Sequence, residues 1–350
     1  MTQDSKTETR TPLNAAIIGA GRMGITHLAI LGGHPAVKVV AIADDSPLMT
    51  RVFKKFRPDI QLFASYETMF ASLPLDMVLI ATPPRLHAPM IDASLAAGLS
   101  VFVEKPFTLQ AADAQRLLAQ SREKRGTYQV GYVNRFNDIF IKAKRLLDDG
   151  ILGRLIGFRS DMFGRTVTRP SDGGGWRAQR QDGGGCLFEF GSHAIDLMVY
   201  LLGKPDRAMG SCLTPIYSAG VEDMVRANFV YGSGLVGSIN VNWSDTSYRK
   251  PTNKIEILGE NGKLLADQHE LKLYLNRAAA PFRAGWNTNF ITDSFTPVPF
   301  YVRGNEFTRQ LFHFAQRALD PSLPNLCGFA DATATQEVID MVLADAGMEM

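Results

Sequence analysis

Glu189 and His193 lie four residues apart in the stretch GGGCLFEFGSHAIDLMVYLLG, residues 183–203, which is otherwise almost entirely apolar. At 3.6 residues per turn they share one narrow arc of a helix with Asp196 and Tyr200. A carboxylate beside an imidazole is suited to general acid–base catalysis. The same pattern is equally typical of a core histidine paired with a carboxylate, or of a polar surface stripe, so the helix alone leaves the choice open.

Lys105 is the second residue that could take part in chemistry. It closely follows the run SVFV, residues 100–103, which predicts a buried strand, and it precedes Pro106. Proline restricts the preceding residue to an extended conformation, so the direction of the lysine is constrained. If the strand belongs to a parallel sheet, Lys105 lies at the carboxyl end of that sheet, where such sheets bind ligands. A lysine at a strand end is otherwise usually a solvated charge.

The elements before Lys105 predict such a sheet. A buried strand at 14–19 runs into the motif GAGRMG, a helix follows, and a second strand at 37–43 ends in Asp44. A GxGxxG motif between a strand and a helix, with an acidic residue about 20 positions later, is the fingerprint of a dinucleotide-binding unit. Strands and helices continue to alternate up to about residue 133, which predicts a doubly wound parallel sheet.

The motif also predicts how a cofactor is held. The first glycine allows a tight turn, the second lets a pyrophosphate approach the backbone, and the third lets the helix pack closely on the strand. Asp44 is expected to accept hydrogen bonds from the adenosine ribose, and its charge repels a 2′-phosphate, so NAD is favoured over NADP. The predicted cofactor-binding residues of this unit are Gly19, Gly21, Arg22, Met23, Gly24 and Asp44.

A second domain is predicted after residue 130. The predicted strands are at 154–163, 207–213, 223–231, 235–243, 254–258 and 271–275. Short glycine turns between several of them predict a large, mostly antiparallel sheet. The fold class is α/β, with an N-terminal Rossmann domain and a C-terminal α+β domain whose sheet is open on one face. The expected boundaries are a disordered start at 1–13, the Rossmann domain at 14–130 with roughly 304–350 returning to it, and the second domain at 131–303.

The composition argues against several classes of function. The 350 residues include 37 lysines and arginines against 35 aspartates and glutamates, which gives no electrostatic case for nucleic acid or an anionic membrane as a partner. We expect no membrane span and no signal peptide, because no apolar run is long enough and the first residues are polar. Three scattered cysteines without a CxxC favour a reducing compartment, here the cytoplasm, and predict no metal site.

Five motifs stand in order along the chain: GAGRMG, ATPPRLHAPM, VFVEKPF, GYVNRF and GGGCLFEFGSHAID. Together they resemble the Gfo/Idh/MocA family, the glucose–fructose oxidoreductase and inositol dehydrogenase group, over nearly the whole chain from about residue 13. The resemblance implies that Lys105 and His193 are the catalytic lysine and histidine, with Glu189 where the family usually has aspartate. The residues that it places along or behind the cofactor are Thr82, Pro83, His87, Glu104, Lys105 and Arg135.

The resemblance implies an NAD-dependent oxidoreductase acting on a secondary hydroxyl or ketone of a sugar, cyclitol or sugar derivative. His193 is then the general base, Lys105 stabilises the developing alkoxide, and Glu189 supports one of the two. Substrate contacts are also predicted for Asp196 and, in the arginine-rich loop 164–185, for Trp176 and Arg177. The composition of this loop is equally typical of a solvated loop without a ligand. The aspartate is equally suited to completing the polar network. Two alternatives stay open: a non-catalytic dinucleotide-binding sensor, and an enzyme whose NAD is permanently bound and acts as an internal redox catalyst.

The resemblance further implies that subunits pair through the open face of the second sheet, giving a homodimer or homotetramer. Two positions depart from the family pattern. Glu189 is one methylene longer than aspartate, which changes its reach. Pro84 replaces an asparagine that is common after the Thr-Pro pair, which affects how the nicotinamide side is held.

Overall fold

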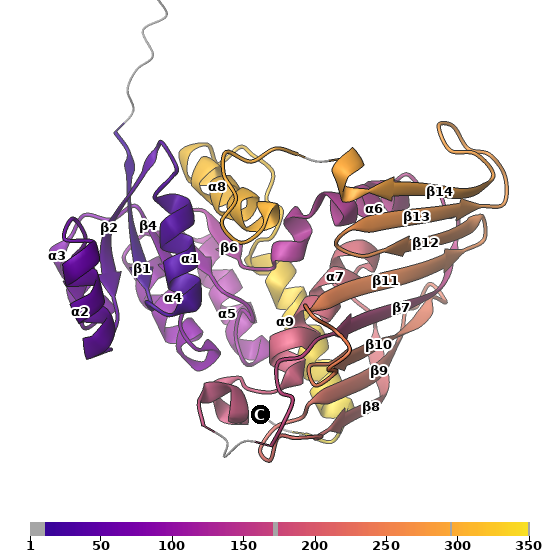
Figure 1. The fold of residues 1–350 in the computed structure, drawn as a ribbon, viewed down its shortest axis with the longest axis horizontal. Helices are drawn as coiled ribbons and strands as arrows, with labels where there is room; N and C mark the ends of the chain where they lie inside the picture. The colour runs from indigo at the N-terminus through magenta and orange to yellow at the C-terminus, as the bar shows by residue number, and fades with distance from the viewer. Residues whose placement is uncertain (1–10, 171–173, 295, 349–350) are drawn as a thin grey trace, which may run out of the picture.

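The computed structural model describes residues 11–170, 174–294 and 296–348. The described residues form two domains, each built around its own β-sheet (Figure 1). Residues 1–10, which make up most of the start expected to be disordered, lie outside the described residues.

The first domain contains a parallel sheet of six strands in the order β3-β2-β1-β4-β5-β6. Its strands are β1 Leu13–Ile18, β2 Val37–Ala43, β3 Gln61–Phe63, β4 Met77–Ile80, β5 Ser100–Val103 and β6 Tyr128–Val130. The helices between them are α1 Arg22–Leu31, α2 Pro47–Phe56, α3 Tyr66–Ser72, α4 His87–Ala96 and α5 Ala111–Arg122. The strand order reverses between β1 and β4, and doubly wound sheets bind dinucleotides at the carboxyl ends of such strands. The predicted Rossmann domain is confirmed.

Local sequence explains these elements. The central strands are short aliphatic runs, and every residue of β4 is buried, as expected for a parallel strand packed between helices. Helix α1 starts directly after Gly21. Helix α2 starts at Pro47, where proline is tolerated, and the hydroxyl of Ser46 accepts from the N–H of Met49 as an N-cap.

The second domain contains an eight-stranded sheet in the order β14-β13-β12-β11-β7-β10-β9-β8. Its strands are β7 Leu155–Phe163, β8 Arg207–Thr214, β9 Met224–Val230, β10 Val236–Asn242, β11 Thr252–Gly259, β12 Gly262–Ala266, β13 Glu270–Leu275 and β14 Gly285–Phe290. Strands β7 and β10 run parallel and the other neighbours are antiparallel, which confirms a mostly antiparallel sheet. Strand β12 and the edge strand β14 are not among the predicted strands. In β14 the sequence GWNTNF lacks an aliphatic alternation.

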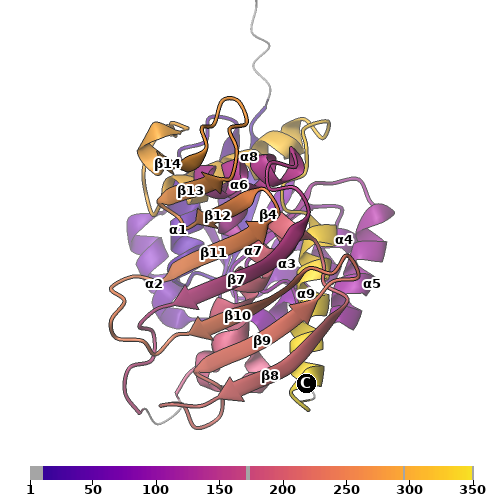
Figure 2. The ribbon, with the colours of Figure 1, turned by 90° about the vertical axis from the view of Figure 1, so that its right-hand side faces the viewer.

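One face of this second sheet is covered and the other is open. Buried and exposed residues alternate along β11, where Ile255 faces the core and Lys254 faces outward. Helices α6 Asp138–Asp148, α7 Ser192–Leu202 and α9 Phe329–Asp345 pack on the inner face, toward the first domain (Figure 1). Figure 2 shows the outer face, over which no described helix lies.

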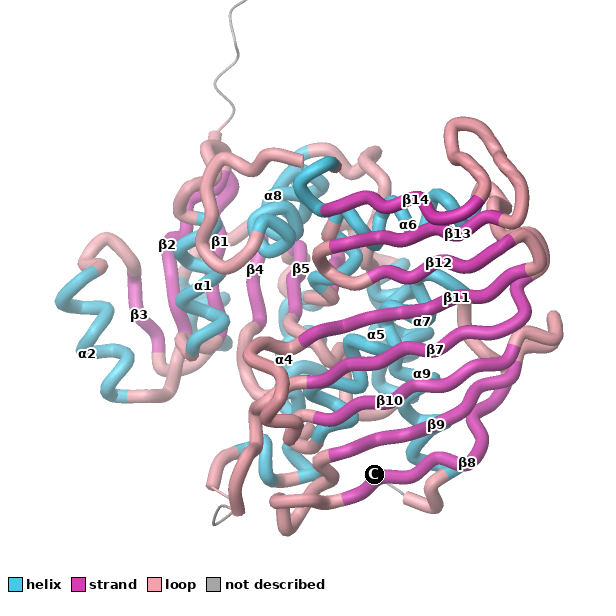
Figure 3. The backbone as a smooth tube through the Cα atoms, turned by 45° about the vertical axis from the view of Figure 1, so that its right-hand side comes forward, coloured by secondary structure: helices cyan, strands magenta, loops and turns pink. Residues whose placement is uncertain are grey.

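The C-terminal part of the chain packs against both domains. A linker over residues 296–304 leads from the second sheet to α8, Asn305–Leu319, as Figure 3 shows. Helix α8 contributes Phe314 to the core of the first domain. Helix α9 contributes Phe329 to the first domain and Val342 to the core of the second. This last helix is therefore shared between the two domains.

Residues 180–202 include an apolar helical stretch. It contains the π-helical turn Leu187–Gly191, which runs directly into α7. By length and composition alone this stretch could cross a membrane, but 72% of its apolar window is buried inside the protein. Phe188 and Leu197 belong to the core of the second domain, so the stretch packs as a core helix.

Candidate active site

The glycine loop of the first domain has the geometry expected of a dinucleotide site. Gly19 has a φ of +92°, and a Cβ there would lie 2.8 Å from the oxygen of Ala81. A Cβ on Gly24 would lie 1.9 Å from the oxygen of Gly19, so a side chain would push α1 away from the strand. Around Gly21 no heavy atom lies within 4 Å of a Cβ, which leaves room for a pyrophosphate at the start of α1. The loop therefore fits NAD.

Asp44 follows β2 beside this loop. Its Oδ2 accepts a hydrogen bond from the N–H of Ala20 at 2.6 Å, and its Oδ1 accepts from the N–H of Ser46 at 2.9 Å. Each carboxylate oxygen has a further lone pair, so Asp44 can hold the loop and still accept from ribose hydroxyls. Asp45 is exposed and adds a second negative charge next to it.

This arrangement predicts a preference between cofactors. We expect NADH to bind at least about tenfold more tightly than NADPH, because Asp44 repels a 2′-phosphate. Titration calorimetry with both cofactors measures the difference. Asp44→Asn keeps the shape of the side chain and one acceptor oxygen but removes the charge. This variant should therefore reduce the difference between the affinities for NADH and NADPH. Equal affinities in the wild-type protein would contradict this role of Asp44.

Lys105 connects the two domains. It follows β5, just before a cis peptide bond to Pro106. Its ammonium donates hydrogen bonds to the backbone oxygen of Glu189 at 2.8 Å and to Oε2 of the same residue at 3.2 Å. The two side chains are mostly buried, with 12% and 17% of their surfaces exposed. The lysine at the strand end and the carboxylate of the polar stripe are therefore in direct contact.

The charge of Glu189 is balanced from two sides. Arg177 donates to its Oε1 at 3.4 Å, and the same guanidinium lies 4.3 Å from the centre of the Trp176 ring. Burial acts to raise the pKa of Glu189, but the charges of Lys105 and Arg177 outweigh burial and lower the pKa to about 2. Glu189 is therefore ionised at neutral pH. Trp176 and Arg177, the predicted substrate contacts, border this group.

His193 lies one turn beyond Glu189 and is neutral at physiological pH. Burial and the charge of Lys105 lower its pKa to about 3, although the charge of Glu189 acts in the opposite direction. Within the described chain its Nδ1 is buried without a hydrogen-bond partner, and the ring of Tyr132 packs edge-on against it. Asn253 donates to its backbone oxygen at 3.1 Å. Glu189 hydrogen-bonds to the lysine, so its influence on the imidazole is electrostatic.

Three of the predicted cofactor-side residues surround the turns after β4 and β5. His87 is fully buried, with Nδ1 2.8 Å from the oxygen of Pro106 and Nε2 3.1 Å from the oxygen of Thr82. Burial lowers its pKa. His87 therefore supports the two turns from behind, one of the two places that the resemblance allows for it. Thr82 lies next to Gly19, where a Cβ would meet its methyl group at 3.0 Å, and Pro83 leads into the turn before α4.

A buried pair behind Lys105 includes a residue that the sequence did not single out. His27 Nε2 lies 2.7 Å from Oε1 of Glu104, and the histidine is fully buried in α1. Burial acts to raise the pKa of Glu104, but the hydrogen bond and charge of His27 together with the contribution of Lys105 outweigh burial and leave the pKa lowered. Glu104 therefore links α1 to the strand end that carries Lys105. The position of His27, three residues after Gly24, offered no signal for this contact.

Arg135 and Asp196 pair with each other in the interior. Arg135 donates to Asp196 through Nη2 at 2.8 Å and Nε at 3.1 Å, and to Asp331 through Nη1 at 2.9 Å. The first two side chains are 3% and 1% exposed, and the guanidinium lies over the ring of Tyr200. This burial fits a place for Arg135 behind the cofactor rather than along it. Completing a polar network is the role that the geometry supports for the aspartate.

Gly183 lets the two domains approach each other. A Cβ at this position would lie 2.7 Å from Pro84 and 2.8 Å from Leu109, both of the first domain. The neighbouring Asp182 forms an ion pair with Arg85 across the same junction at 2.9 Å. Pro84 departs from the family pattern, and its ring has room at this junction because Gly183 has no side chain.

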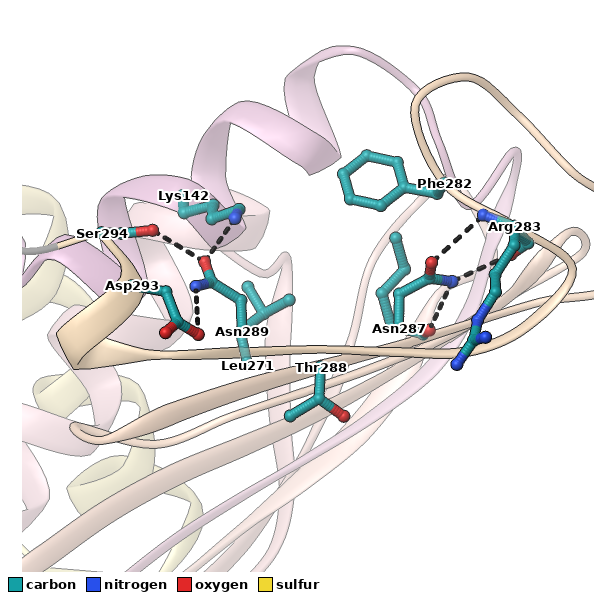
Figure 4. A pocket seen from close by; sticks show the side chains of 10 residues that line it. Lys142, Leu271, Phe282, Arg283, Asn287, Thr288, Asn289, Asp293 and Ser294 are labelled. Atoms are coloured by element: carbon teal, nitrogen blue, oxygen red, sulfur yellow. Dashed lines mark hydrogen bonds between the residues drawn. The ribbon is translucent and has the colours of Figure 1, made fainter.

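A crevice lies at the β14 edge of the second sheet (Figure 4), and none of the site residues described above lines it. It measures about 470 Å³ and is bordered by α6, β13 and β14. Asn289 accepts hydrogen bonds from Lys142 and Ser294. The side chain of Asn287 accepts a hydrogen bond from the backbone N–H of Arg283 and donates one to the backbone oxygen of the same residue. These side chains satisfy one another and hold the sheet edge, so the domain junction is the better candidate for an active site.

Two family models match the chain. One, described as the oxidoreductase family with an NAD-binding Rossmann fold, matches residues 13–132, and the other, described as the GFO/IDH/MocA C-terminal domain, matches residues 140–265. The chain belongs to the Gfo/Idh/MocA family. It is therefore an NAD-binding oxidoreductase, in agreement with the open glycine loop and with Asp44.

This Gfo/Idh/MocA protein is similar to several named proteins along most of its length. It is 29% identical to a putative UDP-kanosamine synthase oxidoreductase subunit of Amycolatopsis mediterranei, over 96% of each chain. It is 26% identical to scyllo-inositol 2-dehydrogenase (NAD(+)) of Bacillus subtilis, over 93% of this chain and 92% of that one. Levoglucosan dehydrogenase, solved in complex with NADH, shares the fold with a TM-score of 0.83 and 22% identity, over 96% and 97% of the two chains.

Proposed function

We propose that this protein transfers a hydride between NAD and a secondary hydroxyl or keto carbon of a sugar, cyclitol or sugar derivative. The observation that carries the proposal is the contact of Lys105 from the first domain with Glu189 from the second, one helical turn before His193. A lysine, a carboxylate and an imidazole thus gather at the carboxyl end of the nucleotide-binding sheet. A protein that merely senses a dinucleotide has no need of this group.

Oxidising a secondary alcohol removes a hydride and a proton from one substrate. Bound NAD supplies the hydride acceptor at C4 of its nicotinamide. His193 is neutral, so it can take the hydroxyl proton, and in reduction it returns a proton. Lys105 donates a hydrogen bond to the substrate oxygen and stabilises the alkoxide charge that develops there. Glu189 holds the ammonium in place through its carboxylate and its backbone oxygen.

Two kinds of observation support a carbohydrate-like substrate. Trp176 and Arg177 together offer an apolar ring and a cation, which suit a sugar face and an anionic group. Among the similar proteins, one is named a scyllo-inositol dehydrogenase, and one was solved with levoglucosan. Neutral sugars, cyclitols, sugar acids and nucleotide sugars are therefore the candidates.

A dehydrogenase screen tests the proposal. The purified protein is incubated with NAD and panels of these four compound classes, and NADH formation is followed by absorbance. We expect turnover with at least one class. Tight NADH binding without turnover in any class would favour the sensor. Cofactor that stays bound through purification, detected by absorbance and mass spectrometry, would favour a permanently bound NAD.

The lowered pKa of His193 sets an expectation for the pH dependence of oxidation. An ordinary histidine base becomes protonated below about pH 6.5 and loses activity. His193, with a pKa of about 3, stays neutral far below that. We therefore expect kcat/KM to show no acidic limb between about pH 8 and about pH 5. A limb centred near about pH 6.5 would argue against His193 as the base in this environment.

Glu189→Gln is expected to lower activity more than Glu189→Asp, because aspartate keeps the charge that holds Lys105 and glutamine removes it. Removing the carboxylate also removes a charge that raises the pKa of His193, so any acidic limb should move to lower pH. The measurement is kcat/KM against pH for the wild type and both variants. Equal losses of kcat/KM in the two variants, or an acidic limb that moves to higher pH, would show that Glu189 does not act on Lys105 or His193 through its charge.

We also propose that subunits pair through the open outer face of the second sheet as a homodimer or homotetramer. That face carries the ion pairs Arg159–Asp161 and Lys263–Glu256, and Trp286 is 48% exposed. Charges of both signs on one face can pair with those of a second copy related by a twofold axis. Light scattering after gel filtration tests this, and a monomer at working concentration would contradict it.

A further inference from the structure

Glu222 is a buried carboxylate that takes no part in the proposed hydride transfer. It lies just before β9, and its side chain is 2% exposed. Its Oε1 accepts a hydrogen bond from the N–H of Leu187 at 2.8 Å, and its backbone oxygen accepts one from the N–H of Cys186 at 2.9 Å. The first N–H groups of a helix have no acceptor within the helix itself, and a negative charge near them is favourable. Glu222 therefore caps the helical turn that carries Glu189, from a different part of the chain.

The other carboxylate oxygen of Glu222 holds the loop over residues 176–185. Oε2 accepts a hydrogen bond from Nη2 of Arg180 at 2.7 Å, and this is the only ion pair that the guanidinium forms with the described residues. Nη1 of Arg180 is buried and lacks a hydrogen-bond partner in the described part of the chain. Trp176 and Arg177, the predicted substrate contacts, belong to the same loop. One carboxylate thus contacts both the loop and the helical turn.

Two of the three glycines before the helix make this contact possible. Gly185 has a φ of +106°, and a Cβ there would lie 2.4 Å from Oε1 of Glu222. A Cβ on Gly184 would lie 2.4 Å from the backbone oxygen of Arg177, which accepts a hydrogen bond from the N–H of Gly185 at 3.1 Å. The absence of side chains at these positions therefore lets the loop fold back against the carboxylate.

The segment that carries Glu222 is itself fixed. The neighbouring Asp223 is fully buried, and its Oδ2 accepts hydrogen bonds from the N–H groups of residues 216–218 at 2.6, 2.6 and 2.8 Å. A Cβ on Gly220 would lie 2.9 Å from the backbone oxygen of Ala178, so the segment before Glu222 also packs directly on the loop. The carboxylate of Glu222 therefore acts from a rigid support.

We propose that Glu222 is a positioning residue of the active site, which holds the loop 176–185 and the turn of Glu189 in one arrangement. Lys105 donates to both the backbone oxygen and the carboxylate of Glu189, so a shift of this turn displaces both hydrogen bonds. Arg177 donates to the same carboxylate from the loop at 3.4 Å. Glu222 thus controls the surroundings of Glu189 from two sides without touching a substrate. The kinetic part of this inference rests on the proposed function, whereas the state of the loop can be measured without a substrate.

Limited trypsin digestion of the variant Glu222→Gln measures the state of the loop. Glutamine keeps an acceptor oxygen for the N–H of Leu187 but leaves Arg180 without a counter-charge, which favours exposure of the guanidinium and opening of the loop. We expect cleavage after Arg177, followed by mass spectrometry, to become about tenfold faster than in the wild type. Replacing Arg180 with glutamine as well removes the unpaired charge and should restore most of the resistance.

Asp138→Asn is the matched control. The carboxylate of Asp138 pairs with Arg309, whose side chain is also 21% exposed, and the described groups that this carboxylate bonds, on Thr296 and Arg309, lie outside the loop. Cleavage after Arg177 should proceed at the wild-type rate in this variant. An unchanged rate in Glu222→Gln, or an equal acceleration in Asp138→Asn, would overturn the proposal, since the loop would then depend on other contacts or on overall stability.

Steady-state kinetics with the substrate that the screen identifies distinguish positioning from a purely structural role. We expect Glu222→Gln to raise KM about tenfold and to lower kcat less than about threefold, because the loop is released while the turn of Glu189 keeps its cap. Glu222→Ala removes the cap as well and should also lower kcat. Faster cleavage with unchanged KM and kcat would overturn the positioning role. If the screen finds no substrate, the digestion still decides whether Glu222 holds the loop, so this proposal and the proposed function fail separately.

Discussion

Replacing Lys105 with methionine is expected to lower turnover about 10²–10³-fold, the usual effect of removing one charged donor from a reacting oxygen. Methionine fills most of the volume of lysine and keeps a flexible apolar stem. The ammonium is lost, and with it both hydrogen bonds to Glu189. The measurement is kcat, followed as NADH formation with the substrate that the screen identifies.

Two comparisons separate this effect from a defect in binding or folding. The affinity for NADH should change little, because the glycine loop and Asp44 lie at other strand ends. Lys142→Met is the matched control, since it removes the same group from α6, where Lys142 donates to Asn289 in the remote crevice. Its turnover should equal that of the wild type. A folded Lys105→Met protein with near-normal turnover would refute the role of Lys105.

The nucleotide-binding half could be predicted from sequence because its signals are local. Gly19 must adopt a positive φ, and Gly24 must lie against the oxygen of Gly19, so the spacing of the glycines encodes the turn directly. Short aliphatic strands and regular helices between them then determine the doubly wound order. The second sheet was predicted less completely, since β14 is rich in asparagine and is held by its pairing with β13 rather than by a pattern of its own.

Local sequence patterns could not predict contacts between residues that are far apart in the chain. Lys105 and Glu189 are 84 positions apart, and the family resemblance rather than periodicity placed them together. Periodicity placed Asp196 on the same arc as His193, but it could not show that Arg135 lies opposite the aspartate from another part of the chain. The polar residues on this arc therefore fall into two groups. Glu189 and His193 face Lys105, whereas Asp196 and Tyr200 face the buried guanidinium of Arg135.

The largest effect on stability is expected at Asp196, away from the domain junction. Its carboxylate accepts hydrogen bonds from Nε and Nη2 of Arg135 and, at 3.1 Å, from the hydroxyl of Thr335. Burial acts to raise the pKa of Asp196, and the charge of Arg135 opposes that shift. Arginine stays protonated at any pH that the fold tolerates. Asp196→Asn therefore leaves a buried guanidinium without its main counter-charge.

Such a loss costs about 3–5 kcal/mol of unfolding free energy, which corresponds to a fall in Tm of roughly 6–20 °C for domains of this size. Thermal and denaturant unfolding measure it. Asp331→Asn is the matched control, because Asp331 pairs with the same guanidinium but is 38% exposed, and it should cost less than about 1 kcal/mol. Similar costs for both variants would show that burial of the Arg135–Asp196 pair does not decide its contribution.

The same variant tests whether Asp196 completes the buried polar network or binds a substrate. With a side chain that is 1% exposed and fully engaged with Arg135, the aspartate cannot reach a substrate without breaking the pair. At a temperature where Asp196→Asn is still folded, KM for the substrate and the Kd for NADH should therefore match the wild type. A raised KM together with an unchanged Tm would reverse the argument, since it would mean that the carboxylate leaves Arg135 during turnover and binds the substrate after all.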